Sequence, residues 1–416
     1  MVGGGPAGLT AALMAARQGA SVLLLERMAQ PGLKLRLTGK GRCNLTNMAP
    51  MAEFLQHIGP DARFLRNAFG RFFNRDLCAF VEQLGVPLQE ERGKRVFPVS
   101  GKSTDVFLAL VRALEAMPNA EIRRNARVGE LLLESDGQAP ALRGVRLADG
   151  TELLSRSVVL CTGGVTYPST GSTGDGYRLA AQAGHSIVEP VAALSPLICA
   201  EPVVHDMVDF MLKNVSLRLD DEQGRKLFEQ FGELSFTADG MAGPIVLAAS
   251  RAAARRLHEG GRLTASIDLK PALTAEQLDR RLIADLNENG KRLWYDALRL
   301  WLPAELTDEA CRRLKVPKYK RLHQVDASER RRLLNLLKGW HYTVTGCHGP
   351  EESLVTQGGV ATNEVNPKTM ESRLLPGLYI AGELLNLDAD TGGYNLQIAF
   401  STGYAAGLGI ASQKIR

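Results

Sequence analysis

The chain has 416 residues, of which 45% are hydrophobic, and its 50 Lys and Arg against 45 Asp and Glu give a net charge of +5. This hydrophobic content excludes a chain that is disordered throughout, and so small a net charge indicates neither a nucleic-acid partner nor an acidic one. The 42 glycines form no Gly-x-y repeat, which excludes collagen and places them in specialised turns.

Cysteine usage and apolar runs bear on the compartment. The six cysteines form no C-x-x-C pair and have no accompanying His spacing, so we expect a reducing compartment, no disulfide framework and no metal site. No apolar run reaches the ~18 residues that a membrane span needs. Residues 9–16 are apolar like the core of a signal peptide, but no basic residue precedes them and a strand follows. We therefore expect a cytoplasmic protein with no membrane partner.

The first 25 residues are predicted to form the turn, helix and strand of a βαβ unit. Residues 9–18 are good helix formers, and Gly19 ends the helix. Residues 21–25 are a continuous apolar run, which is typical of a strand buried on both faces of a parallel sheet. Only Met1 and Val2 precede the glycines, which is too little for a central strand of about five residues.

A dinucleotide fingerprint lies in this unit. Gly3-x-Gly5-x-x-Gly8 has the spacing that gives a tight turn, a close approach of the pyrophosphate and close helix–strand packing, and Pro6 and Ala7 complete it. The phosphates would rest on the amides at the start of the helix. Glu26, followed by Arg27, lies close to the spacing of about 20 residues expected for a carboxylate that binds ribose hydroxyls.

A loop of small, basic and amide residues spans residues 39–47. It suits a backbone pressed against an electron-rich ring or an anion, and a basic group beside a flavin would stabilise its reduced form. Cys43 lies in this loop, and we expect an inert small side chain there rather than a redox thiol.

Downstream, residues 64–84 are predicted to form one helix and residues 105–117 another, the latter ended by Pro118. From residue 121 to residue 154, short apolar runs are separated by Asp136-Gly137 and Asp149-Gly150, which are hairpin signals. We expect a small antiparallel sheet over these residues.

A second glycine-rich loop follows a buried strand at residues 158–160. It begins with Thr162, Gly163 and Gly164 and continues to Gly176. Turn residues after a buried strand lie at the carboxyl edge of a parallel sheet, where ligands bind. Tyr167 is a candidate to line that site, and an ordered loop without a ligand is the alternative.

The middle of the chain differs in composition. Residues 197–270 mix β-branched runs with turn pairs, and residues 274–337 are helical and charged. The basic residues between 312 and 332 are predicted to be a solvated helical face, and a docking patch is the alternative. We expect a first part of one domain at residues 1–190, an inserted domain at 191–340 (β-rich to 270, helical over 271–338), and the remainder of the first domain at 341–416.

The C-terminal segment repeats the strand-and-loop pattern. A strand at residues 378–380 runs into Gly382 and Glu383, and residues 391–397 open a final small-residue helix whose positive end would face an anion. Because no second G-x-G-x-x-G occurs, any NAD(P)H would have to visit the flavin directly, as a transient co-substrate.

The runs 39–47, 163–177 and 391–399 resemble the FAD-dependent flavoproteins of the aminoacetone oxidase-like and dehydro-bile-acid reductase-like family, in the two-dinucleotide-binding-domain flavoprotein group. Residues 232–237 and 243–244 resemble it as well. The family usually has a His where this chain has Ala238, so no role of that His is carried over.

The resemblance implies an α/β fold, a Rossmann-like FAD-binding domain with an inserted β-rich, barrel-like and helical domain. It places the adenosine ribose on Glu26, adenine at the Val128 backbone, the isoalloxazine near Lys34 and the 39–47 loop, and the pyrimidine ring over the last helix. The FAD-binding residues that we expect are Gly3, Gly5, Pro6, Ala7, Gly8, Glu26, Arg27, Lys34, Lys40, Gly41, Arg42, Cys43, Asn44, Val128, Thr162, Gly163, Gly164, Gly382, Glu383, Gly392, Gly393, Asn395, Leu396 and Gln397.

The function predicted on this basis is that of an FAD-dependent oxidoreductase, in which hydride passes between flavin N5 and a small organic substrate, with NAD(P)H or oxygen completing turnover. No catalytic residue can be assigned, and His185, His341 and His348 are expected to be structural. We expect neither nucleic acid nor an obligate protein as a partner. The alternatives are a flavin-dependent RNA-modifying enzyme and a non-catalytic flavin-binding sensor.

Overall fold

The computed structural model describes residues 1–134 and 140–413. They divide into two compact units, unit 1 with residues 1–192 and 350–416 and unit 2 with residues 193–349. Strand β16 (Trp340–Cys347) therefore belongs to unit 2, whereas we expected the first domain to resume at residue 341. The physical reason is pairing, because β16 binds β11 (Leu197–Cys199) and β15 (Leu263–Asp268) and closes a barrel.

Unit 1 is built on a parallel sheet. Strand β1 (Val22–Leu25) pairs with β5 (Ala120–Arg123), and β9 (Val158–Leu160) pairs with β18 (Leu378–Ile380). Val2 joins the two pairs by parallel bridges to Leu25 and Leu160, so the order is β5, β1, Val2, β9, β18. Short as it is, the segment before the glycines thus occupies the centre of the sheet.

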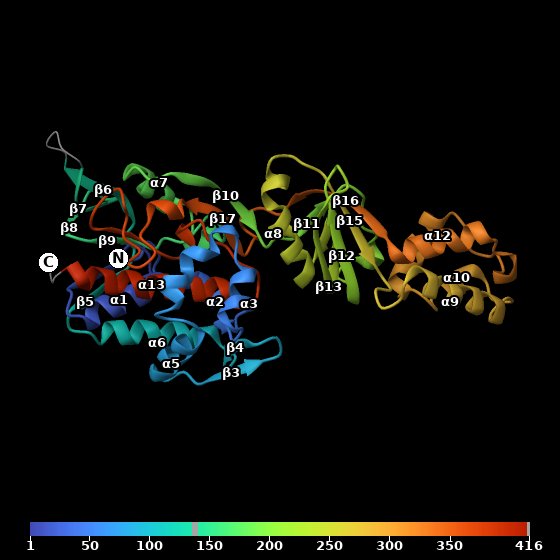
Figure 1. The fold of residues 1–416 in the computed structure, drawn as a ribbon, viewed down its shortest axis with the longest axis horizontal. Helices are drawn as coiled ribbons and strands as arrows, with labels where there is room; N and C mark the ends of the chain where they lie inside the picture. Colours follow the sequence, from blue (N-terminus) through green and yellow to red (C-terminus); the bar gives the residue numbers. More distant parts are fainter. Residues whose placement is uncertain (135–139, 414–416) are drawn as a thin grey trace. The chain divides into compact units, whose positions relative to one another are not determined.

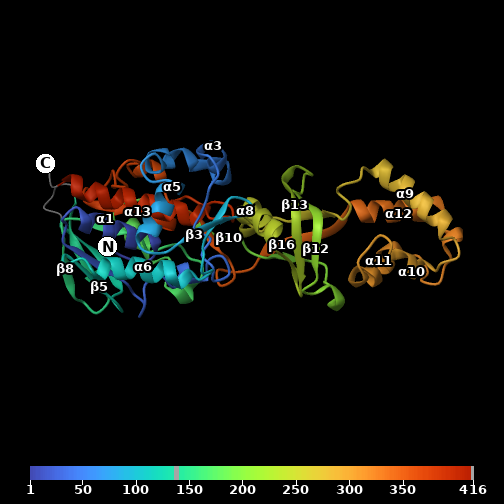
Figure 2. The same ribbon diagram turned by 90° about the horizontal axis from the view of Figure 1, so that it is seen from below.

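Helices flank this sheet, and α1 (Pro6–Arg17) and α13 (Tyr394–Gln413) lie side by side (Figure 1; Figure 2). Glycines on α13 permit the close approach. A Cβ on Gly403 would stand 2.3 Å from the Ala7 carbonyl oxygen, and one on Gly407 would stand 2.6 Å from that of Ala11. Helix α6 (Ser103–Glu115) packs beside α1, and α7 (Asp175–Gln182) follows the second glycine loop.

The helix predicted over residues 64–84 is wrong as a single element. The structure has a 3₁₀ turn η2 (Pro60–Leu65), α4 (Arg66–Phe69) and, after a break, α5 (Asn74–Gln83), preceded by α3 (Met51–Phe54) and η1 (Leu55–His57). The break follows Gly70, and Asp76 starts the new helix because its carboxylate accepts the Phe73 N–H at 2.8 Å.

Two antiparallel sheets and one strand pair complete unit 1. The sheets order as β2 (Thr46–Asn47), β4 (Arg95–Pro98), β3 (Leu88–Glu91), and as β6 (Val128–Glu134), β7 (Ala141–Leu147), β8 (Glu152–Leu154); the pair is β10 (Ile187–Ala193) with β17 (Val355–Val360). The predicted antiparallel sheet thus begins at Val128 rather than at residue 121, because β5 pairs in parallel with β1. The Asp149-Gly150 turn joins β7 to β8, whereas Asp136-Gly137 lies outside the described residues.

Unit 2 combines a closed six-stranded barrel with a helical part (Figure 1). The barrel order is β11, β14 (Gly240–Ala242), β13 (Lys226–Thr237), β12 (Met211–Asp220), β15, β16, and α8 (Pro244–His258) packs on it. The helical part comprises α9 (Ala275–Glu288), α10 (Trp294–Leu298), α11 (Thr307–Leu314) and α12 (Ala327–Lys338). Its buried side chains, Trp294 among them, share one apolar core with the barrel, where Trp340 is also fully buried.

Short 3₁₀ turns connect several of these elements, at Pro168–Thr170, His205–Met207, Ala304–Leu306, Leu322–Gln324, Thr362–Glu364 and Gly382–Leu384. Across the described parts of both units, no helix is long and apolar enough to cross a membrane.

His185 is buried in unit 1, with both ring nitrogens engaged. Its Nδ1 lies 3.1 Å from Glu364 Oε2, and its Nε2 lies 2.8 Å from Ser372 Oγ. Burial lowers the pKa of His185 below its ordinary value, although Glu364 opposes the shift. Both ring nitrogens thus hold protein groups, in keeping with the structural role expected for this histidine.

This histidine makes stability depend on pH. Because its folded-state pKa is lowered, the unfolded chain binds the proton first as the pH falls, and stability present above pH ~6.5 is lost as the pH drops below it. We expect the melting temperature to fall from pH 7.5 to pH 5.5, and to fall less in His185→Gln. An equal fall of the melting temperature in the two proteins over this pH range would contradict the assignment.

Candidate functional site

Five segments distant in sequence meet at the carboxyl edge of the parallel sheet. A Cβ on Gly3 would stand 2.5 Å from the Cys161 carbonyl oxygen, one on Gly382 would stand 2.9 Å from Ala7 Cβ, and one on Gly393 would stand 2.4 Å from the Thr46 carbonyl carbon. All three glycines have positive φ, between +76° and +103°. The glycine-rich loops of residues 3–8, 161–164, 382–383 and 392–393 therefore surround one place, with residues 44–47 beside them.

The fingerprint glycines have different surroundings. A Cβ on Gly8 would stand 1.9 Å from the Gly3 carbonyl oxygen, so only glycine fits there. Gly5, which precedes α1, has no protein atom within 4 Å of the position of a Cβ, and its φ of −77° suits any residue. Nothing in the protein requires glycine at position 5, which leaves room for a ligand at the helix N-terminus.

Glu26 stands at the end of β1, as the fingerprint predicts. Its two carboxylate oxygens each accept a backbone N–H at 2.8 Å, one from Gly4 and one from Met28. Burial is the largest influence and raises the pKa of Glu26 in spite of these bonds. A carboxylate has about four acceptor sites, so two remain for ribose hydroxyls. Arg27 points elsewhere and pairs with Asp175 at 3.1 Å.

The loop of residues 39–47 is held in an unusual backbone conformation, with φ of +57° at Lys40 and +60° at Cys43. Cys43 is fully buried, which raises the pKa of its thiol to about 12, so it is an unreactive side chain as predicted. Arg42 forms an ion pair with Glu91 and lies 4.3 Å from the centroid of the Phe97 ring. Gly41, which follows Lys40 in the chain, also has positive φ.

Lys34 and Glu383 form an ion pair at the centre of this edge. Lys34, on α2 (Leu33–Leu37), donates to Glu383 Oε2 and to Thr166 Oγ1, both at 2.7 Å, and Glu383 also accepts the Thr356 N–H at 2.9 Å. Only 21% and 22% of the two side chains are exposed. Sequence reasoning selected the two charged residues but missed the threonines, since Thr166 is 132 residues from Lys34, Thr356 is 27 residues from Glu383, and no local motif joins either pair.

The predicted residues Asn395 and Gln397 of α13 use their side chains for hydrogen bonds within the protein. Asn395 donates to the Ala389 carbonyl oxygen at 2.8 Å and accepts the Ala389 N–H at 2.9 Å. Gln397 is fully buried, where Thr46 Oγ1 donates to it at 2.5 Å and it donates to Ser401 Oγ at 2.9 Å. Leu396, between them, is partly buried against the apolar core beside α1.

The other predicted residues lie at different distances from the residues of the site. Gly163 lies beside Glu383, because a Cβ there would stand 3.9 Å from Glu383 Oε2, and Gly164 packs on Thr356. Thr162 follows β9 in the same loop. Gly392 accepts a hydrogen bond from Asn47 at 3.2 Å. Val128 begins β6 and lies in the same apolar core as Ala7 and Cys161, which belong to two of the glycine loops.

Of the remaining histidine candidates, His341 pairs with Ser266 at 2.9 Å and His348 with Asp239 at 3.1 Å, both in unit 2. The pair that sequence reasoning missed is His57 with Asp390, 2.9 Å apart beside the Gly392–Gly393 turn. The two residues are 333 positions apart, so no local motif could have joined them.

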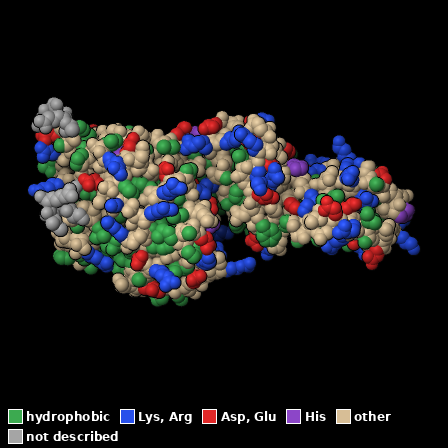
Figure 3. All heavy atoms as spheres, viewed as in Figure 1, with side chains coloured by type: hydrophobic (Ala, Val, Ile, Leu, Met, Phe, Trp, Pro, Cys, Tyr) green, Lys and Arg blue, Asp and Glu red, His purple; other side chains and the backbone are tan. Residues whose placement is uncertain are grey.

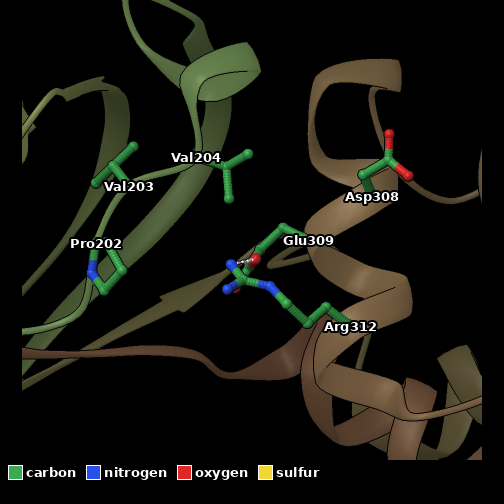
Figure 4. A pocket seen from close by; sticks show the side chains of 6 residues that line it. All are labelled: Pro202, Val203, Val204, Asp308, Glu309 and Arg312. Carbon is green, nitrogen blue, oxygen red and sulfur yellow. Dashed lines mark hydrogen bonds and ion pairs between the residues drawn. The ribbon is translucent and has the colours of Figure 1, made fainter.

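A separate pocket of about 400 Å³ lies in unit 2 between residues 202–204 and helix α11 (Figure 4). Pro202, Val203 and Val204 form its apolar wall, and Asp308, Glu309 and Arg312 lie opposite. Glu309 pairs with Arg312 and with Arg313, and the glycine loops contribute nothing to this pocket.

Comparison with known proteins assigns the chain to a family. A model described as the HI0933-like protein Rossmann domain matches residues 1–409. The chain belongs to the HI0933-like family. Members similar to it over nearly their whole length include the 3-dehydro-bile acid delta(4,6)-reductase of Clostridium scindens, at 32% identity over 99% of this chain and 98% of the relative. Another is the ribosomal RNA dihydrouridine synthase of Escherichia coli, at 28% identity over 100% and 98%.

Solved structures agree on the fold of this HI0933-like protein. The 3-ketosteroid-delta4-(5alpha)-dehydrogenase of Rhodococcus jostii RHA1 matches with a TM-score of 0.53 at 16% identity, over 99% of this chain and 95% of that one. The 3-ketosteroid delta1-dehydrogenase of Sterolibacterium denitrificans matches with a TM-score of 0.51 at 14% identity, over 99% and 98%. At these identities the likeness concerns the fold alone.

The family membership confirms the predicted fold class, the FAD cofactor and the class of FAD-dependent oxidoreductase for this HI0933-like protein. The described residues fit that cofactor. Gly5 leaves a space that a Cβ would fill, and buried Asn44 Oδ1 has no hydrogen-bond partner among the described residues. An unpaired buried acceptor costs about 1–3 kcal/mol, which a ring N–H of a bound flavin would offset.

Proposed function

We propose that this protein reduces a carbon–carbon double bond conjugated to a carbonyl group, with NAD(P)H as the source of electrons. The relatives support this reading because their names share one chemistry. A delta(4,6)-reductase acting on a 3-dehydro steroid acid and a dihydrouridine synthase both saturate a ring double bond beside a carbonyl. End-to-end similarity to both is the observation that carries the proposal.

The residues that would hold FAD are those gathered at the carboxyl edge of the sheet. Gly5 and the N-terminus of α1 would take the pyrophosphate, and Glu26 the adenosine ribose. Lys34 would lie on the isoalloxazine side, Glu383 would lie beside the ribityl chain, and the Gly393 turn would lie near the pyrimidine ring. When bound and reduced, FAD supplies hydride from N5 to the substrate.

The protein contributes orientation and charge. Lys34 fixes a positive charge at the site through two short hydrogen bonds, and the N-terminus of α13 adds a positive dipole end. Both would stabilise negative charge that develops on the pyrimidine ring. The partly buried ion pair also joins the loops after β9 and β18, because Lys34 donates to Thr166 in the first loop and to Glu383 in the second.

Steady-state oxidation of NADH and NADPH tests this proposal. We expect turnover with enones such as cyclohexenone or a 3-keto-Δ4 steroid, and formation of the saturated ketone. Cyclohexanone, which has the carbonyl but not the double bond, is the matched negative control. Oxidation of NAD(P)H only by oxygen, with no enone consumed, would indicate an oxidase instead.

A second candidate substrate, a base in RNA, is favoured by the charge distribution. Residues 271–338 contain 15 Lys and Arg against 10 Asp and Glu, which is a net charge of +5. The rest of the chain contains 35 basic and 35 acidic residues, so the helical part carries the whole net charge of the protein. Figure 3 shows many basic side chains on the helical part, mixed with acidic ones. Tyr319, which is 83% exposed, lies between Lys318 and Lys320, and an aromatic ring among lysines can stack on bases.

RNA binding through this surface predicts a strong dependence on salt. We expect binding of a ribosomal RNA fragment to weaken steeply between 50 and 200 mM salt, and Lys315→Glu with Arg331→Glu to weaken it further at every salt concentration. Both side chains are exposed, so the fold tolerates the changes. Failure of the wild type to bind at low ionic strength would remove this candidate.

A further inference from the structure

A histidine–carboxylate pair is attached to the first turn of α13. His57 Nδ1 lies 2.9 Å from Asp390 Oδ2, and the Asp390 N–H donates to the His57 carbonyl oxygen, also at 2.9 Å. The imidazole stacks on Tyr394, with ring centroids 4.4 Å apart and an interplanar angle of 21°. Asn395 holds the other side, because it donates to the Asp390 carbonyl oxygen at 3.2 Å. The pair is therefore fixed in position.

Its place in the fold is beside the proposed cofactor site. Tyr394 and Asn395 directly follow Gly392 and Gly393, whose turn rests on Thr46 and Asn47. A movement of this turn would therefore be passed to the imidazole through Tyr394 and Asn395.

Unit 1 contains a second such pair, which makes a useful comparison. The side chain of His185 is fully buried, and both of its nitrogens are engaged. His57 has 37% of its side chain exposed, and no hydrogen bond to its Nε2 is found in the described part of the chain. Only His57 thus has a ring nitrogen available to a ligand and to solvent.

We propose that His57 is the general acid that completes reduction of the double bond, and that Asp390 is its positioning residue. This inference rests on the proposed function. The β-carbon of the substrate would receive hydride, with two electrons, from reduced FAD, which would thereby be oxidised. The electron pair of the double bond would then take the proton of His57 Nε2–H at the α-carbon. Solvent returns a proton to His57, and NAD(P)H restores reduced FAD.

The charges around the imidazole fit this role. Asp390 accepts the Nδ1 proton, which leaves Nε2 to exchange the second proton. Asp388 lies in the same segment, and Glu53, itself paired with Lys94 at 2.7 Å, acts on the phenol of Tyr394, whose ring stacks on the imidazole. Burial, together with Glu53 and Asp390, raises the pKa of Tyr394 to about 12, so its phenol stays neutral.

The test separates the two halves of the reaction in the FAD-loaded protein. In anaerobic stopped-flow measurements, His57→Gln should leave reduction of the flavin by NADPH within about twofold of wild type. Its reoxidation by cyclohexenone should slow by about 100-fold or more, the usual contribution of a general acid. Asp390→Asn should slow reoxidation less and shift its pH profile. His205→Gln, at an exposed histidine of unit 2, is the matched control.

A second readout does not depend on turnover. If His57 faces the flavin, protonation of the imidazole should shift the absorbance of bound oxidised FAD, and this titration should vanish in His57→Gln but not in His205→Gln. Identical titrations in all three proteins, or unchanged reoxidation in His57→Gln, would overturn the assignment. If wild type shows no reoxidation by enones but the titration is present, the proposed substrate class fails while the placement of His57 stands.

Discussion

Gly5→Val is expected to prevent FAD binding while the protein still folds. A Cβ at position 5 would meet no protein atom within 4 Å and needs no unusual backbone angle, so the loss of the N-cap glycine of α1 is the main cost, and the free energy of unfolding without FAD should change by only about 1 kcal/mol. The same side chain would occupy the space proposed for the pyrophosphate. We expect FAD affinity to fall at least about 100-fold, or about 2.8 kcal/mol, by titration calorimetry.

Gly8→Val is the matched control for this substitution, three residues away. Its Cβ would stand 1.9 Å from the Gly3 carbonyl oxygen, so we expect loss of the folded state itself. Circular dichroism and urea denaturation distinguish the two outcomes. Tight FAD binding by Gly5→Val would contradict the proposed position of the pyrophosphate.

The Lys34–Glu383 ion pair gives the second large effect. Lys34→Met leaves the Glu383 carboxylate partly buried without its cation, and Glu383→Gln leaves the ammonium without its anion. Removing one partner of a fully buried pair costs about 3–5 kcal/mol; because about a fifth of each side chain here is exposed, we expect about 1–3 kcal/mol for each change.

The double variant reports whether the two charges act on each other. Since Lys34→Met with Glu383→Gln removes both charges, its loss of unfolding free energy should be smaller than the sum of the single losses by about 1 kcal/mol, within the 0.5–3 kcal/mol found for residues in contact. Urea denaturation of the four proteins measures this directly. Additivity within about 0.5 kcal/mol would show that the contact contributes little.

The sequence analysis anticipated the FAD domain because its signals are local. The fingerprint, the apolar strands and the turn glycines each specify a backbone conformation within a few residues, and the structure has β1, β9, β18 and α1 where they were expected. The predicted helix over 64–84 failed for the opposite reason. Its apolar spacing continues across Gly70, but the break depends on Asp76 and on the aromatic contacts of Phe69 and Phe73 with Phe54.

Side-chain partners were less accessible from the sequence. The partners of two residues predicted at the flavin were not foreseen, because Arg42 pairs with Glu91, 49 residues away, and Gln397 binds Thr46 and Ser401. The end of the inserted unit was placed too early because β16 resembles any other short strand until β11 and β15 pair with it. His57 and Asp390 become a pair only once the chain is folded.

The central claim is that the reduced flavin gives its electrons to a double bond conjugated to a carbonyl. An anaerobic single turnover tests it most directly. The FAD-loaded protein is reduced with one equivalent of NADPH and mixed with one equivalent of cyclohexenone, and flavin absorbance and cyclohexanone are followed together. We predict that the absorbance of oxidised flavin returns as one equivalent of cyclohexanone forms. Flavin that stays reduced with cyclohexenone and with a 3-keto-Δ4 steroid, but is reoxidised on admission of oxygen, would contradict the account.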